Sequence, residues 1–434
     1  MLAFFQFYKT YSRAWHILFL MLAVGIITGA AGASLAALGL FLIRKPRLKY
    51  ETLLVLFLFT FFLGDNFEGP LAFANTLRFV MLGIALVVLG PKELLSNNVA
   101  WYIFPFAILA TGITLVLSPL GIEAVARGLS YFLMALVLFK LVQLLILANP
   151  QRLYNLLILI LALYVGVNFL LLVAPIFGTA YIKGRFTGLM GNPNGLGLVA
   201  MFSYAIVDVI SRLKASSFSP KILVGFKVLL IVLILLTASR TSLLGVVAYE
   251  LSVRLIKTKV LLVFALFLLL VAYNTLLNID VEALIRAYGL ADYLRVESLY
   301  DASGRTEVWQ VAVDEIYRQP WWGKGMLYDG YYIDSYADRY IGEVRERHWG
   351  GVWSSYLSLL LNVGILGVLA FAYFWYHMYR LSCMPIVKTA FLIMCLLSAL
   401  TESWMAASMN AFMPLVFLCW GLQIYQPIKL PQAA

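Results

Sequence analysis

Three arginines in this chain lie beside long apolar stretches, and their side chains suit phosphate binding. Arg185 lies in KGRFTGLMGNPNGLG, Arg240 in TASRTSLLG and Arg305 in SGRTEVW. A guanidinium group binds phosphate oxygens through paired hydrogen bonds. An arginine at membrane depth usually has a partner. Together they indicate a site for a phosphorylated lipid headgroup, with Ser239 as a further ligand. Each arginine taken alone could instead reach lipid phosphates at the bilayer surface. This alternative is weakest for Arg240, because its neighbours are small residues with hydroxyl groups.

An irregular turn follows Arg185. Glycine, proline and asparagine in the segment 191–195 break a helix at membrane depth. Irregular backbone there is tolerated where it is buried in protein or lines a cavity. The N-terminus of the next helix offers free N–H groups to an anion. We therefore expect Asn192 and Asn194 to bind substrate, with an ordinary interfacial turn as the alternative.

A general base is harder to identify. His348 in RERHWGG has the side chain whose ordinary pKa suits proton transfer from a hydroxyl, although it could equally be a solvated loop histidine. Glu402 in LTESWMA is either a turn cap or a carboxylate of the site. We expect His348, Arg240 and Arg185 to be catalytic and Arg305 and Glu402 to bind substrate.

Several classes of chemistry find no support. The sequence has no ATP-binding loop, dinucleotide fingerprint or HExxH motif. The three cysteines form no CxxC pair, and no pair of acidic residues demands a metal. We therefore expect no cofactor, so that the energy for a reaction comes from an activated, diphosphate-linked substrate.

The elements that position these residues are membrane helices. Of the 434 residues, 63% are hydrophobic and 12% charged, whereas soluble domains carry about 25% charged residues. The net charge of +11 indicates cytoplasmic anchoring rather than nucleic-acid binding. The fold class expected is all-α, a polytopic integral membrane protein with about 12–14 transmembrane helices. We place the apolar spans at 15–43, 52–64, 72–90, 101–119, 124–147, 153–175, 195–213, 221–237, 241–256, 259–277, 353–379, 387–402 and 407–425.

The loops alternate in charge. Basic loops, which cytoplasmic loops favour, alternate with loops that carry Asp65, Glu68 and Glu123, the 176–194 segment, Arg240, the 278–352 segment and Glu402. This second set is expected to face outward. The first span is too long for one upright helix, and Gly25, Gly29 and Gly32 could break it.

One outward loop is large. The domains expected are transmembrane helices at 1–277, a loop subdomain at 278–352 and C-terminal transmembrane helices at 353–434. Within the loop, TEVWQVAVDEIYRQP (Thr306–Pro320) places apolar residues at helical spacing and ends at proline. Its tryptophans and tyrosines suit a membrane interface or, less often, sugar rings.

The chain resembles the O-antigen ligase and O-antigen/exopolysaccharide polymerase superfamily. The similar segments are GRFTGLMGNPNGLG, TASRTSLLG, SGRTEVWQVAVDEIYRQPWWGKGM and SSYLSLLLNVGILG, in that order over residues 180–370. The resemblance implies a GT-C-like, metal-independent glycosyltransferase in the bacterial inner membrane. Its site would face the periplasm and take glycan from a polyprenyl (undecaprenyl) diphosphate carrier. Arg185 and Arg240 would hold the diphosphate, and Arg305 would hold the donor or shape the loop.

One departure separates two activities. Where ligases of this family commonly carry histidine, before their Tyr-Leu stretch, this chain has Trp353, and His348 lies five residues earlier. This favours a polymerase, which joins carrier-linked O-antigen or exopolysaccharide repeat units, over a ligase that transfers glycan to lipid A core. Expected partners are the lipid-linked oligosaccharide donor, a glycan or lipid A core acceptor, membrane lipids and a chain-length regulator. A lipid-linked sugar transporter is the alternative of another class, although we find no internal repeat of the kind many transporters show.

Overall fold

The computed structural model describes residues 9–66, 69–174, 180–182, 184–255, 305–341 and 347–426. The predicted span 259–277 and loop residues 278–304 lie outside them. The described chain is helical apart from one two-stranded hairpin, β1 (Tyr181–Ile182) and β2 (Arg185–Phe186). Among the described residues, seven helices are long and apolar enough to cross a membrane. The expected all-α, polytopic membrane fold is confirmed.

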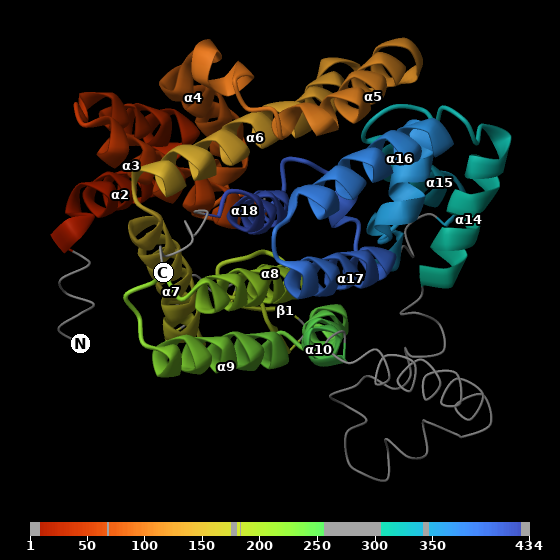
Figure 1. The fold of residues 1–434 in the computed structure, drawn as a ribbon. Helices are drawn as coiled ribbons and strands as arrows, with labels where there is room; N and C mark the ends of the chain where they lie inside the picture. The colour runs from red at the N-terminus through yellow and green to blue at the C-terminus, as the bar shows by residue number, and fades with distance from the viewer. Residues whose placement is uncertain are drawn as a thin grey trace, which may run out of the picture.

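The helices follow the predicted spans closely (Figure 1). Those before the hairpin are α2 (Ser12–Ala37), α3 (Pro46–Leu63), α4 (Phe73–Leu95), α5 (Phe104–Leu117), α6 (Gly121–Ala148) and α7 (Pro150–Val173). Those after it are α8 (Pro193–Leu213), α9 (Pro220–Leu236), α10 (Arg240–Leu255), α14 (Arg305–Arg318), α15 (Tyr328–Tyr340), α16 (Ser355–Leu381), α17 (Pro385–Thr401) and α18 (Phe412–Ile424). Short 3-10 turns lie at Leu38–Leu42, Ala100–Ile103, Arg347–Gly350 and Trp404–Ala406.

Proline sets many of the helix starts. A proline occupies the first turn of α3, α7, α8, α9 and α17, where its missing N–H costs nothing. Asn149, Asn192 and Ser219 precede three of these prolines and accept hydrogen bonds from first-turn N–H groups. The first long span breaks at Gly29, which has φ 75°.

The helix connections meet in two groups. In one, Arg152 at the start of α7 donates to Glu51 of α3 at 2.7 Å. In the other, Asn66 after α3 donates to the Leu189 carbonyl oxygen before α8 at 2.8 Å. These contacts join loops of the same predicted side, so the packing agrees with the alternation of charge along the sequence.

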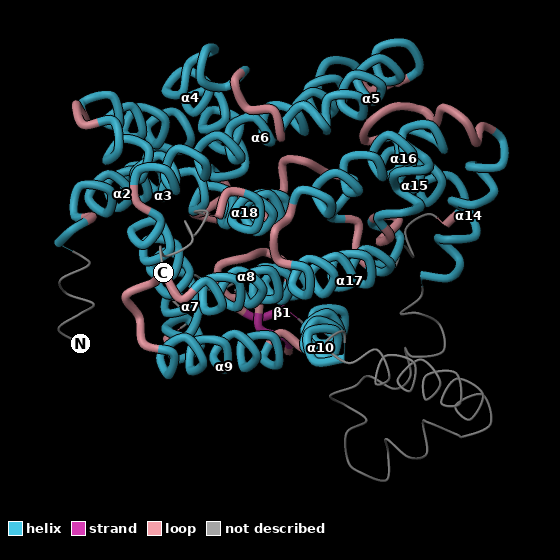
Figure 2. Tube along the Cα trace, in the orientation of Figure 1, coloured by secondary structure: helices cyan, strands magenta, loops and turns pink. Residues whose placement is uncertain are grey.

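Helix α8 lies at the centre of the site region. It packs against α9, α10 and α18. A Cβ added at Gly197 would lie 2.6 Å from Ser239 Cβ, so only glycine lets α8 approach the α9–α10 turn this closely. The β1–β2 hairpin lies beside the same helices (Figure 2).

The loop helices are attached to a broken helix. Helix α16 is interrupted at Gly364, which has φ 62°. The backbone N–H groups of Lys324 and Gly325 donate to the freed carbonyls of Leu361 and Asn362 at 2.9 and 2.7 Å, and residues 320–321 accept from the N–H groups of 365–366. These four backbone groups therefore each have a partner, as membrane depth requires. This pairing explains Gly323 and Gly364, where an added Cβ would meet the backbone of the paired segment.

Helices α14 and α15 lie beside α16 (Figure 1). Their small apolar core contains Val308, Ala312, Ile333, Ala337 and Trp349, with Val352 and Leu361. The predicted loop helix at 306–320 is confirmed as α14, which ends two residues before Pro320. Its position places Arg305 at the start of the helix, facing the bundle.

Candidate functional site

Arg185 is held between two helix ends. Its hairpin pairs it with Ile182. The guanidinium Nε donates to the Thr237 carbonyl at 3.0 Å, and one terminal nitrogen donates to Asn194 Oδ1 at 2.5 Å. The Ala238 carbonyl lies 3.4 Å from the same nitrogen, and Ala238 has φ 48°. The left-handed residue thus turns the end of α9 toward Arg185.

Asn194 connects Arg185 to a buried carboxylate. Its amide nitrogen donates to Glu402 Oε1 at 2.8 Å. Asn192, by contrast, uses its side-chain oxygen to accept from the Asn194 backbone N–H at 3.0 Å. The structure therefore gives Asn192 a capping contact at the start of α8, and its predicted contact with substrate stays a prediction.

Glu402 is the centre of the cluster. It is only 5% exposed and follows the last residue of α17. Arg305 approaches its carboxylate at 3.6 Å and donates to the neighbouring Thr401 carbonyl. The Glu402 carbonyl accepts from both the backbone N–H and the hydroxyl of Ser355, at 3.2 and 2.6 Å. Glu402 is the C-cap residue of α17 and contacts Arg305 and Asn194, and its predicted contact with substrate stays a prediction.

Arg240 directly follows the α9–α10 turn whose Thr237 and Ala238 carbonyls hold Arg185. It is half-buried and begins α10. Ser239 just before it shares a hydrogen bond with Ser242 at 2.8 Å, and Thr241 bonds Thr401 at 2.6 Å, which joins α10 to α17.

The cluster has a net positive charge. Arg185, Arg240, Arg305 and Glu402 come from four separate segments and carry three positive charges against one negative charge. Low surrounding dielectric strengthens the attraction of such a group for a phosphate anion. Among the described residues, no three His, Cys, Asp or Glu side chains gather as metal ligands.

Histidine does not occupy the position that the resemblance favours. Trp353 has φ 53°, and the Arg305 guanidinium lies over its ring at 5.7 Å from the centroid. His348 lies in the 3-10 turn Arg347–Gly350. Its side chain lies outside the described residues, so its role as base stays a prediction.

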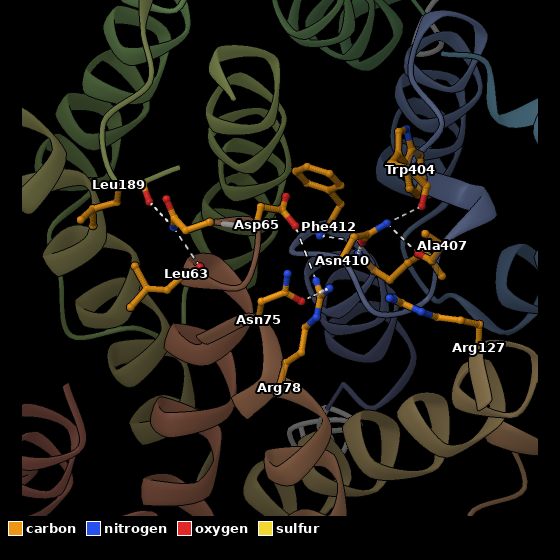
Figure 3. A network of polar contacts seen from close by, with 12 residues as sticks. Leu63, Asp65, Asn75, Arg78, Arg127, Leu189, Trp404, Ala407, Asn410 and Phe412 are labelled. Atoms are coloured by element: carbon orange, nitrogen blue, oxygen red, sulfur yellow. Dashed lines mark hydrogen bonds and ion pairs between the residues drawn. The ribbon is translucent and has the colours of Figure 1, made fainter. Parts of the chain in front are cut away.

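A second polar cluster was not predicted from the sequence. Figure 3 shows Arg78 of α4 and Arg127 of α6 pointing into one corner, with Asp65 and Asn410. Arg78 lies 3.7 Å from Asp65 and donates to Asn75 at 2.6 Å. The sequence does contain a sign of this cluster. Both arginines lie inside the predicted spans 72–90 and 124–147, where a charged residue indicates function.

A buried, largely non-helical segment joins the two clusters. Residues 402–411 run from Glu402 to Asn410, which donates to the Trp404 and Ala407 carbonyls, both at 2.6 Å. Asn410 also caps α18 by accepting from the Phe412 N–H at 3.0 Å. The segment therefore connects the two clusters.

Comparison with known families identifies one region. Residues 225–372 match the family model described as O-Antigen ligase. No curated protein matches the chain. The matched region contains Arg240, Arg305 and Trp353, whereas Arg185 and Glu402 lie outside it.

Proposed function

We propose that the protein is a polymerising membrane glycosyltransferase, and the match of residues 225–372 to the O-antigen ligase family model supports its resemblance to this superfamily. It takes glycan from a polyprenyl diphosphate carrier, with undecaprenyl as the expected lipid, and joins it to a second carrier-linked glycan. The site lies at the outer face of the inner membrane.

The convergence of three arginines carries the proposal. Arg185 and Arg305 contact Asn194 and Glu402, respectively, and Arg240 begins α10 next to Thr241, which bonds Thr401 of α17. A diphosphate bound there would meet fixed positive charge where negative charge develops as the glycosidic bond breaks. Fixed cations help most at that position, because they need no reorganisation during the reaction. Arg185 and Arg240 stabilise the leaving diphosphate, and Arg305 links the loop helices to the donor.

The acceptor hydroxyl attacks the anomeric carbon from the face opposite the diphosphate, so the configuration inverts. Trp353 in place of the ligase histidine favours a glycan acceptor over lipid A core. The loop helices, docked on the break of α16, would cover the site and hold the growing chain.

The purified protein in lipid nanodiscs, given only undecaprenyl diphosphate-linked repeat units, tests the activity. Longer lipid-linked chains are expected on gel analysis. Product that forms only after lipid A core is added would show a ligase instead, and no product with either acceptor would contradict the glycosyltransferase function.

Arg240→Ala and Arg185→Ala should abolish this elongation, with Arg254→Ala as the matched control. Arg254 lies at the far end of α10 with its side chain 76% exposed, so its loss should leave the rate unchanged. Full activity of both site variants would contradict the assignment of the arginines.

A further inference from the structure

The proposed reaction requires a group that takes the proton of the attacking hydroxyl. Trp353 offers no such group, and its ring already packs against Arg305. One carboxylate oxygen of Glu402, Oε1, accepts a hydrogen bond from Asn194 and lies 3.6 Å from Arg305. That oxygen is thus engaged within the donor-binding cluster of Arg185, Arg240, Arg305 and Glu402, and a carboxylate beside this cluster is a candidate base in addition to His348.

The Asp65 carboxylate is partly exposed and forms an ion pair with Arg78. Its side chain is 20% exposed, whereas that of Arg78 is 5% exposed. Arg78 lies 3.7 Å away, which is longer than a hydrogen bond. No residue in the described part of the chain donates a hydrogen bond to the carboxylate, so its lone pairs remain available to a ligand.

Asp65 also borders the donor-binding cluster. A Cβ added at Gly191 would lie 3.1 Å from the Asp65 carbonyl oxygen. The neighbouring Asn66 donates to the Leu189 carbonyl at 2.8 Å. The α3–α4 connection thus packs on the turn that leads directly into Asn194, the residue that joins Arg185 to Glu402.

We propose that Asp65 is the general base of glycan transfer, and that Arg78 is the positioning residue that holds it. This inference rests on the proposed function. The hydroxyl O–H bond breaks and its proton moves to the Asp65 carboxylate, while the oxygen forms a bond to the anomeric carbon. The bond from that carbon to the diphosphate oxygen breaks, and its electron pair leaves with the carrier diphosphate beside Arg185 and Arg240. Water then takes the proton from Asp65.

The electrostatic environment suits a base near neutral pH. Burial raises the pKa of Asp65 to about 6, and Arg78 and Arg127 oppose the rise. Among the described residues, the further titratable groups around this corner are Glu123 of α6, which pairs with Arg127, and the buried Tyr164 of α7. A carboxylate accepts a proton only when ionised, so the rate should rise with pH through about 6 and level off above 7.

Asp65→Asn tests the proposal, because it keeps the shape and removes the ionisable group. The control is Glu123→Gln, since Glu123 borders the same cluster and its side chain is 68% exposed. Elongation should fall about 100-fold in kcat for Asp65→Asn, with the donor KM unchanged. The acid limb of the pH profile should disappear. Glu123→Gln should keep both the rate and the limb.

The outcomes separate the two hypotheses. Suppose that the wild-type protein elongates glycan. An Asp65→Asn rate within threefold of the wild-type rate, or an unchanged acid limb, would then overturn the role of Asp65 but not the proposed function. Failure of the wild-type protein to transfer glycan overturns both. If Asp65→Asn does not fold, Asp65→Glu decides: a shifted acid limb supports the proposal, and an unshifted limb contradicts it.

Discussion

Gly323→Ala is predicted to detach the loop helices from α16. Gly323 has φ 66°, and an added Cβ would lie 2.6 Å from the Asn362 carbonyl carbon. A left-handed alanine costs about 1–2 kcal/mol. Relief of the clash would break the hydrogen bonds from Lys324 and Gly325, at about 1 kcal/mol each. The docking of α14 and α15 should therefore weaken by about 3–4 kcal/mol, and Arg305 would lose its fixed position.

Gly330→Ala is the matched control, because Gly330 lies within α15 with no heavy atom within 4 Å of an added Cβ. Limited proteolysis in detergent, followed by mass spectrometry, measures access to residues 305–341. Gly323→Ala should be cut faster and elongate glycan more slowly, while Gly330→Ala should match wild type or be slightly more resistant. Equal cleavage of both variants would refute the reasoning that the backbone pairing holds these helices.

Three further predictions concern the bundle. Arg305→Ala should lower kcat/KM for elongation about 100-fold. Arg318→Ala should leave kcat/KM unchanged, because Arg318 lies on the same helix with its side chain 73% exposed. Similar rates for the two variants would contradict a role of Arg305 in the site. Gly197→Ala should push α8 away from the α9–α10 turn and reduce elongation, whereas Gly225→Ala, where an added Cβ meets no atom within 4 Å, should not; equal rates would show that this close approach is dispensable. Asp208→Asn should lower the free energy of unfolding by about 3 kcal/mol or more, because that carboxylate pairs with two cations. The melting temperature should fall while donor binding stays intact, because Asp208 lies about 20 Å along α8 from the site. An unchanged melting temperature would count against this ion-pair network.

The sequence predicts the helices well because their limits depend on local chemistry. Prolines and capping residues such as Asn192 act within one turn, and apolar length follows from the bilayer. The break of α16 at Gly364 is harder to predict from the sequence, because its cause is the pairing of two segments about 40 residues apart.

The structure brings together four residues that the sequence singled out, and their roles in binding and catalysis stay predictions. The expected chemistry of Arg185, Arg305, Asn194 and Glu402 fits their arrangement, because charges at membrane depth need partners and the structure places these residues in contact. Arg78 was missed because it was counted as part of an apolar span.

The role of His348 as a base stays a prediction. The separation of His348 from Trp353 along the sequence does not determine where the histidine side chain points. The structure describes only the backbone of its 3-10 turn. Asp65 was predicted only as an outward loop residue. Its relation to Arg78 depends on how α3, α4 and α6 pack, which no local pattern encodes.

Binding of the carrier diphosphate tests the central claim most directly. Native mass spectrometry can measure undecaprenyl diphosphate bound to the wild type, to the Arg185→Ala/Arg240→Ala double variant and to Arg254→Ala. The arginine cluster predicts that the double variant loses binding at least 100-fold while Arg254→Ala binds like wild type. Equal binding by all three proteins would contradict the claim that these arginines hold the donor.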